Sequence, residues 1–118
     1  MSGDVVKGVI GVSAGTYDLR ILSDWTDVFG DLEQRWEASP LKYVDGTQPP
    51  WLVLYGSDDN PGFPEDSRKF YQALVQAGSH AEVHEIPNRN HSGMVSRMAL
   101  PSDPAREFIL QFIAEHTR

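Results

Sequence analysis

The chain of 118 residues carries 10 Lys and Arg against 17 Asp and Glu, which gives a formal net charge of −7, and it contains no cysteine. Its 40% apolar and 23% charged residues are typical of a globular domain, and the length fits a single α/β unit over residues 1–118. The acidic balance argues against a nucleic-acid partner, because phosphate binding needs clustered Lys and Arg. No apolar run is long enough for a membrane span. Without cysteine, disulfides and a thiol nucleophile are excluded.

The N-terminal half contains two of the three predicted strands. Residues 5–12 are β-branched and nearly continuously apolar, which favours a strand buried on both faces. Trp25, Val28, Phe29 and Leu32 then recur at helical spacing and predict a short helix. After the Pro49-Pro50 pair, residues 51–55 form a second apolar run that predicts another buried strand.

The C-terminal half predicts a helix, a strand and a helix. Pro64 is suited to the first turn of a helix, and Gly78 is suited to its end. Residues 81–86 alternate and are followed by Pro87, which indicates a third strand nearer an edge. The last helix is predicted to be capped by Asp103, to begin at Pro104 and to present an apolar stripe formed by Ala105, Phe108, Ile109, Phe112 and Ile113.

The predicted order of strand, helical connection, strand, helix, strand, helix is typical of an α/β protein with parallel-sheet layers and helices on both faces. Three strands make a thin sheet, so the chain is interpreted as part of a larger α/β domain. In such sheets the catalytic and ligand-binding groups gather beyond the carboxyl ends of the strands. The loops after the second and third strands therefore predict the site.

An acid follows the second strand and a histidine follows the third. The first loop reads Gly-Ser-Asp-Asp-Asn from Gly56, and the second places His91 within Asn-His-Ser-Gly. An Asp and a His in this order are two of the three groups of an acyl-transfer triad, in which the imidazole moves the proton of a nucleophile and the carboxylate fixes the ring tautomer.

These segments resemble the C-terminal part of the α/β-hydrolase fold, in particular esterases and lipases of the carboxylesterase and kynurenine-formamidase-like type. The resemblance rests on residues 51–60, the helix from Pro64 to Gly78, the strand 81–86 and the turn around His91, with a weaker match at residues 11–19. It covers the last three strands of that fold and leaves its first five strands unrepresented.

The resemblance implies catalytic roles for Asp59 and His91. Asp59 lies three positions after Gly56, where these hydrolases commonly keep the triad acid, and Asp58 is the rival for that role. Gly11 to Gly15 satisfies the G-x-S-x-G pattern around Ser13. However, no small-residue helix start follows, and the resemblance places Ser13 one strand too late, so a structural serine is the preferred interpretation and the nucleophile is expected outside the chain.

No cofactor or metal is expected. His80 and His84 are four residues apart but straddle the start of a strand, so they do not share a helix face, and no H-E-x-x-H pattern is present. Asp58, Asp59 and Asn60 do not have the spacing of a calcium loop.

The sequence therefore predicts the C-terminal part of a serine hydrolase that acts on a small-molecule ester or acyl substrate. The alternative is a non-catalytic, truncated hydrolase domain that self-associates through its open sheet edge into a homo-oligomer. The polar N-terminus Met1-Ser2-Gly3-Asp4 is not typical of a secretory signal and favours a cytoplasmic location.

Overall fold

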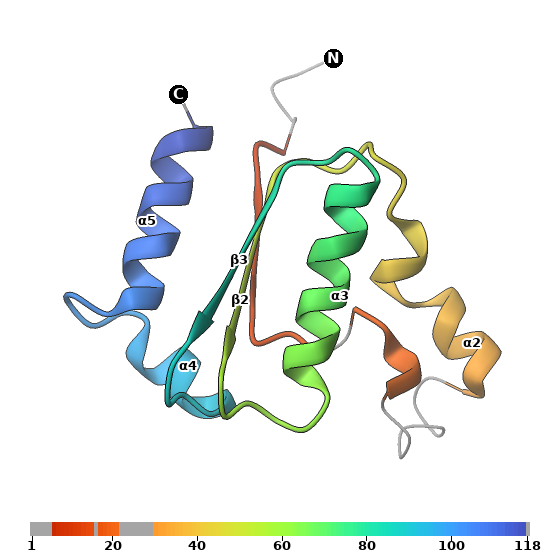
Figure 1. Ribbon diagram of the computed structural model, residues 1–118, viewed down its shortest axis with the longest axis horizontal. Coiled ribbons are helices and arrows are strands. Elements are labelled where there is room, and N and C mark those ends of the chain that lie inside the picture. The colour runs from red at the N-terminus through yellow and green to blue at the C-terminus, as the bar shows by residue number, and fades with distance from the viewer. Residues whose placement is uncertain (1–5, 16, 22–29, 118) are drawn as a thin grey trace.

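Three parallel strands form the sheet in the computed structural model, which describes residues 6–15, 17–21 and 30–117. The strands are β1 (Val9–Val12), β2 (Trp51–Gly56) and β3 (Ala81–Ile86), in the order β1-β2-β3 (Figure 1). Val12 pairs with Leu54, and Leu54 pairs with His84. Because all three strands run in the same direction, the segments that follow them leave the sheet at one edge.

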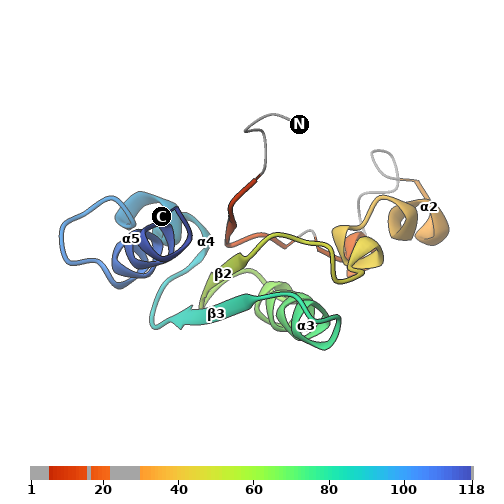
Figure 2. The ribbon, with the colours of Figure 1, turned by 90° about the horizontal axis from the view of Figure 1, so that it is seen from above.

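Helices cover both faces of this sheet. On one face, α3 (Phe63–Gln76) packs Phe70 and Leu74 against Val53. On the other face, α4 (His91–Arg97) and α5 (Pro104–His116) bury a larger cluster: Leu52, Leu54, Ile86, Met94, Ala105 and Phe112. Figure 2 shows the sheet between these two layers. The predicted α/β class with a parallel sheet and helices on its faces is confirmed.

Local sequence signals explain where the longer helices begin. Pro64 lies in the first turn of α3, where its missing N–H costs nothing. Asp103 caps α5 by accepting the N–H of Ala105 at 3.1 Å, and Pro104 follows it, as predicted. Most of the predicted stripe on α5 contacts the core, but Ile113 is 43% exposed.

Two further predictions concern shorter elements. Residues 22–29, which include Trp25, Val28 and Phe29, lie outside the described residues, and the described helix α2 (Leu32–Glu37) starts at the last residue of the predicted pattern. The turn predicted around His91 is instead the first turn of α4. Single turns of 3-10 helix, Leu19–Ile21 and Pro40–Tyr43, complete the connection from β1 to β2. No helix among the described ranges is long and apolar enough to span a membrane.

A buried carboxylate fastens α3 to the segment that follows β1. Asp66 is 2% exposed, and its two oxygens accept the backbone N–H groups of Tyr17 at 3.1 Å and Asp18 at 3.0 Å. Burial raises the pKa of Asp66 from 3.8 to about 6, and the two hydrogen bonds only partly oppose this shift. The folded chain therefore binds more protons than the unfolded chain between about pH 4 and pH 6.

The raised pKa predicts the direction of a pH effect on stability. The contribution of Asp66 to the free energy of unfolding falls as the pH rises through this window and is constant above it. The free energy of unfolding, measured with urea, is expected to be larger at pH 5 than at pH 7. The contribution of Asp66 to this difference is on the order of 1–2 kcal/mol. Asp66→Asn should remove most of that difference, and an unchanged pH dependence in the variant would contradict the assignment.

The outer edge of β1 is open in the described part of the chain. β1 is apolar, Val-Ile-Gly-Val, and it pairs only with β2 there. An unpaired apolar edge is a template for association with another strand. We therefore expect the 118-residue chain to sediment as a mixture of monomer and larger species, and a single compact monomer across the concentration range would contradict this prediction.

Candidate active site

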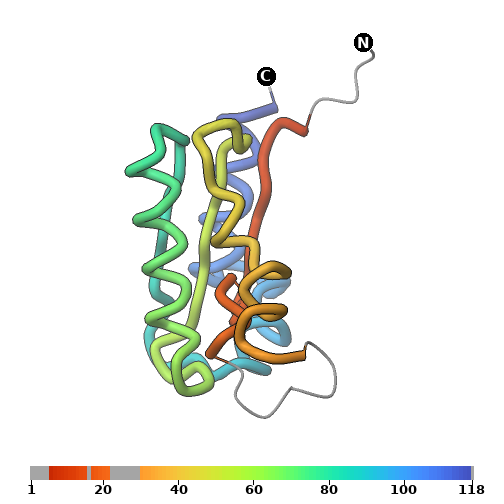
Figure 3. Tube along the Cα trace, turned by 90° about the vertical axis from the view of Figure 1, so that its right-hand side faces the viewer, coloured from red at the N-terminus to blue at the C-terminus, as the bar shows by residue number. Residues whose placement is uncertain are grey.

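Asp59 and His91 meet at the carboxyl edge of the sheet. Asp59 lies in the loop between β2 and α3, and His91 is the first residue of α4, directly after the loop that follows β3. Figure 3 shows both connections at the same end of the sheet. Nδ1 of His91 lies 3.0 Å from Oδ1 of Asp59. The structure therefore brings together the two residues to which the resemblance assigned roles.

The two side chains differ sharply in exposure. The Asp59 side chain is fully buried at 0% exposure, whereas the His91 side chain is 46% exposed. A carboxylate only accepts hydrogen bonds, so in a neutral ring this contact favours the tautomer with the proton on Nδ1 and a lone pair on Nε2. Oδ1 of Asp59 also accepts the N–H of Asn60 at 2.8 Å. In this arrangement Nε2 of His91 belongs to a partly exposed ring, and the contact with the buried Asp59 carboxylate fixes the orientation of that ring.

Hydrogen bonds between the two loops fix this geometry. The N–H of Asp58 donates to the carbonyl of Arg89 at 3.0 Å, and the N–H of Asn88 donates to Oγ of Ser57 at 2.8 Å. Gly56 allows this close approach, because a Cβ at that position would lie 2.1 Å from the Arg89 carbonyl oxygen. A side chain at residue 56 would therefore push the Asp59 loop away from the His91 loop.

An ion pair fixes the His91 loop from the other side. The guanidinium of Arg89 is bonded to the carboxylate of Asp103, and both side chains are largely buried. The Arg89 guanidinium also holds the pKa of Asp103 below its usual range. Asp103 caps α5, so the loop that positions His91 is tied to the start of the last helix. Sequence reasoning missed Arg89, which no motif singles out.

Phe63 forms an apolar wall beside His91. Its ring meets the imidazole edge-on, with centroids 5.5 Å apart and an interplanar angle of 79°. The same ring covers Gly15, where a Cβ would lie 2.2 Å from its atoms. The Phe63 ring therefore lies against both Gly15, in the segment after β1, and His91.

Asp58 and Ser13, the other two sequence candidates, lie apart from this pair. Asp58 is exposed and lines a separate polar hollow of about 230 Å³ with Arg89, Arg97 and other residues of the His91 loop and α4. Ser13 is only 2% exposed, and its N–H donates to the carbonyl of Leu54 at 2.8 Å. Within the described ranges, its buried hydroxyl has no hydrogen-bond partner.

The fold places the chain in the α/β-hydrolase class. The acylaminoacyl peptidase of Pyrococcus horikoshii superposes with a TM-score of 0.74 over 97% of this chain and 20% of that chain, at 19% identity. A truncated carbohydrate esterase from gut microbiota superposes with the same TM-score over 99% of this chain and 45% of that chain, at 16% identity. The resemblance in fold to the last strands of a hydrolase is confirmed.

The sequence places the chain in a family within that class. Residues 12–118 match the model of the prolyl oligopeptidase family, so the chain belongs to this family. The uncharacterized peptidase YuxL of Bacillus subtilis is 33% identical over 73 residues, which are 59% of this chain and 11% of that protein. The esterase LipQ of Mycobacterium tuberculosis is 39% identical over 56 residues, 47% of this chain and 13% of that protein. The matches thus span about a tenth of the length of these relatives.

Proposed function

We propose that this chain is the part of a serine hydrolase that supplies the acid and the base of a Ser-His-Asp triad. The observation that carries the proposal is the 3.0 Å contact between the buried Asp59 carboxylate and the exposed His91 ring, at the carboxyl edge of a parallel sheet. Membership of the prolyl oligopeptidase family supports it, because the family description names a peptidase activity.

Each residue has a defined role in the proposed reaction. Nε2 of His91 takes the proton of a serine hydroxyl while the serine oxygen forms a bond to the acyl carbon of the substrate. The same nitrogen then gives the proton to the leaving alcohol or amine as its bond to the acyl carbon breaks. Asp59 holds the Nδ1–H tautomer and stabilises the imidazolium that forms between these steps.

The nucleophile is proposed to come from outside these 118 residues. A nucleophile must reach both the substrate and Nε2, but Ser13 is 2% exposed and its hydroxyl is enclosed. The chain also matches only about a tenth of its curated relatives. We propose a carboxylic ester or an acyl peptide as the substrate class, because the relatives are described as an esterase and a peptidase.

The isolated chain provides the first test. We expect it to hydrolyse 4-nitrophenyl acetate no faster than buffer containing an equal concentration of free imidazole. Among the residues that the structure describes, the side-chain hydrogen-bond partner of His91 is Asp59 rather than a hydroxyl, and we propose that the nucleophile and the oxyanion hole come from outside this chain. Turnover that disappears in Ser13→Ala would show that the nucleophile has been misassigned.

A further inference from the structure

The other end of β3 carries a row of metal-ligating side chains. His80, Glu82 and His84 stand at alternate positions, so in an extended strand they share one face. His80 is already in the sheet ladder, because its carbonyl accepts the N–H of Trp51 at 3.0 Å. His80 and His84 therefore share a face of the strand rather than a face of a helix.

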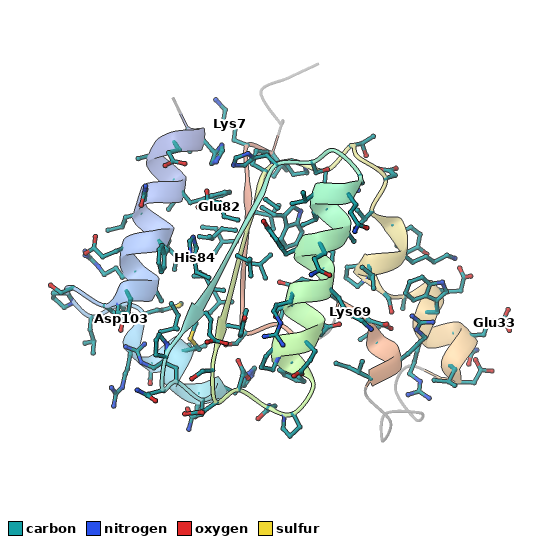
Figure 4. All side chains as sticks on the ribbon, viewed as in Figure 1. Lys7, Glu33, Lys69, Glu82, His84 and Asp103 are labelled. Atoms are coloured by element: carbon teal, nitrogen blue, oxygen red, sulfur yellow. The ribbon has the colours of Figure 1, made fainter. Side chains whose placement is uncertain are left out.

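Helix α5 covers this face of β3 and brings a further histidine to it. The ring of His84 is stacked flat on Phe108, with centroids 3.7 Å apart, and Figure 4 shows Glu82 and His84 between β3 and α5. Near the end of α5, the rings of Phe112 and His116 are in contact, with centroids 4.4 Å apart. The rings of His116 and His80 lie 5.1 Å apart, although 36 positions separate them in the sequence.

Three ligand atoms converge at this point. His80, Glu82 and His116 each offer one potential metal-ligand atom, and these three atoms lie within 4.8 Å of one another. In the described part of the chain, these residues form the group of three His, Cys, Asp or Glu side chains that could hold a metal ion. Oε2 of Glu82 is 3.9 Å from Nε2 of His80, while its other oxygen is 3.4 Å from Nε2 of His84. One carboxylate oxygen of Glu82 therefore lies beside His84, and the other lies nearer His80.

His116 supplies an independent indication of a ligand. Its Nε2 is buried and has no hydrogen-bond partner among the residues that the structure describes. Other buried side-chain atoms among these residues also have no partner, such as the hydroxyl of Ser13, but His116 is the one that belongs to the group of three ligand residues. A metal ion bound by His116, His80 and Glu82 would give this nitrogen a partner.

We propose that His80, Glu82 and His116 bind a Zn²⁺ ion that clamps the end of α5 to the start of β3. Two imidazoles and one carboxylate are a known zinc ligand set, with bonds of about 2.0–2.2 Å and a fourth position for water. The ligand atoms, which lie within 4.8 Å of one another, must approach one another to reach this geometry, and the His80 side chain is 57% exposed. The ion would lie at the amino end of the strands, opposite Asp59 and His91, so we assign it to holding α5 against β3 rather than to the proposed triad.

Titration calorimetry on the untagged chain, stripped of metal by a chelator, tests this proposal. Wild-type chain is expected to bind one Zn²⁺ and to melt at a higher temperature with zinc, because the ion binds the folded state. His116→Gln and His80→Gln should each lower the affinity at least about tenfold and abolish the melting shift. His91→Gln is the matched control at the other end of the sheet, and it should bind zinc as wild type does.

Three outcomes would overturn the proposal: no zinc binding, equal binding by His116→Gln, or loss of binding in His91→Gln, which would place the ion at the candidate active site. Circular dichroism identifies a variant that fails to fold. In that case Glu82→Gln, whose side chain is partly exposed and lies outside the main core, gives the same test. Ca²⁺ should not compete, because it prefers oxygen ligands.

Discussion

Replacing His91 with glutamine, in a polypeptide that joins this chain to the proposed nucleophile-bearing segment, is expected to lower kcat by about 10⁴-fold or more. Nε2 of His91 is the proposed proton acceptor, and glutamine offers no basic nitrogen at that position. KM should change little, because the lost interaction belongs to the transition state rather than to substrate binding. Steady-state kinetics with an aryl ester measures both constants.

Because His91 is partly exposed, its replacement by glutamine should affect catalysis much more than the stability of the fold. Its side chain is 46% exposed, so His91→Gln should leave the melting temperature within a few degrees of wild type. A reactive fluorophosphonate should label the nucleophilic serine much more slowly in the variant, since the hydroxyl is no longer activated. A variant that keeps more than a tenth of wild-type turnover would contradict the role of His91.

Asp59→Asn in the same polypeptide is expected to lower kcat by about 10⁴-fold as well. The amide can donate to Nδ1, and it then stabilises the tautomer that carries the proton on Nε2. In that tautomer the ring cannot accept the proton of a nucleophile. The loss should therefore be in kcat, with the site geometry retained.

Asp58→Asn is the matched control, with the same chemical change at the neighbouring position. Asp58 is exposed and lies outside the 3.0 Å contact, so its replacement should cost less than about tenfold. The reverse ranking of the two variants would transfer the role of the acid to Asp58.

The sequence was informative where local signals and topology agreed. Asp103 and Pro104 mark the start of α5, because a cap depends mainly on neighbouring residues. The two apolar runs contain β1 and β2, although β1 covers only Val9–Val12 of the predicted 5–12 and is half-buried, and the alternating pattern marks β3. The meeting of the Asp59 and His91 loops followed from topology: adjacent parallel strands end at the same edge.

The features that sequence reasoning missed depend on contacts between distant residues. Arg89 is bonded to Asp103 across 14 positions, and Asp66 binds the backbone 48 and 49 positions away, so no local pattern marks either. The row formed by His80, Glu82 and His84 has a local signal, the period of two in a strand, which the helical spacing of His80 and His84 does not reveal. His116 lies beside that row because α5 packs on the face of β3 from which the row projects.

The tautomer of His91 tests the central claim most directly, because the claim is that the buried Asp59 prepares His91 to act as a base. Nitrogen-15 NMR of the labelled 118-residue chain, at a pH where the ring is neutral, distinguishes the protonated from the unprotonated ring nitrogen. The account predicts a proton on Nδ1 in wild type and in Asp58→Asn, and a shift toward Nε2 in Asp59→Asn. A proton on Nε2 in wild type, or an Asp59→Asn spectrum identical to wild type, would contradict it.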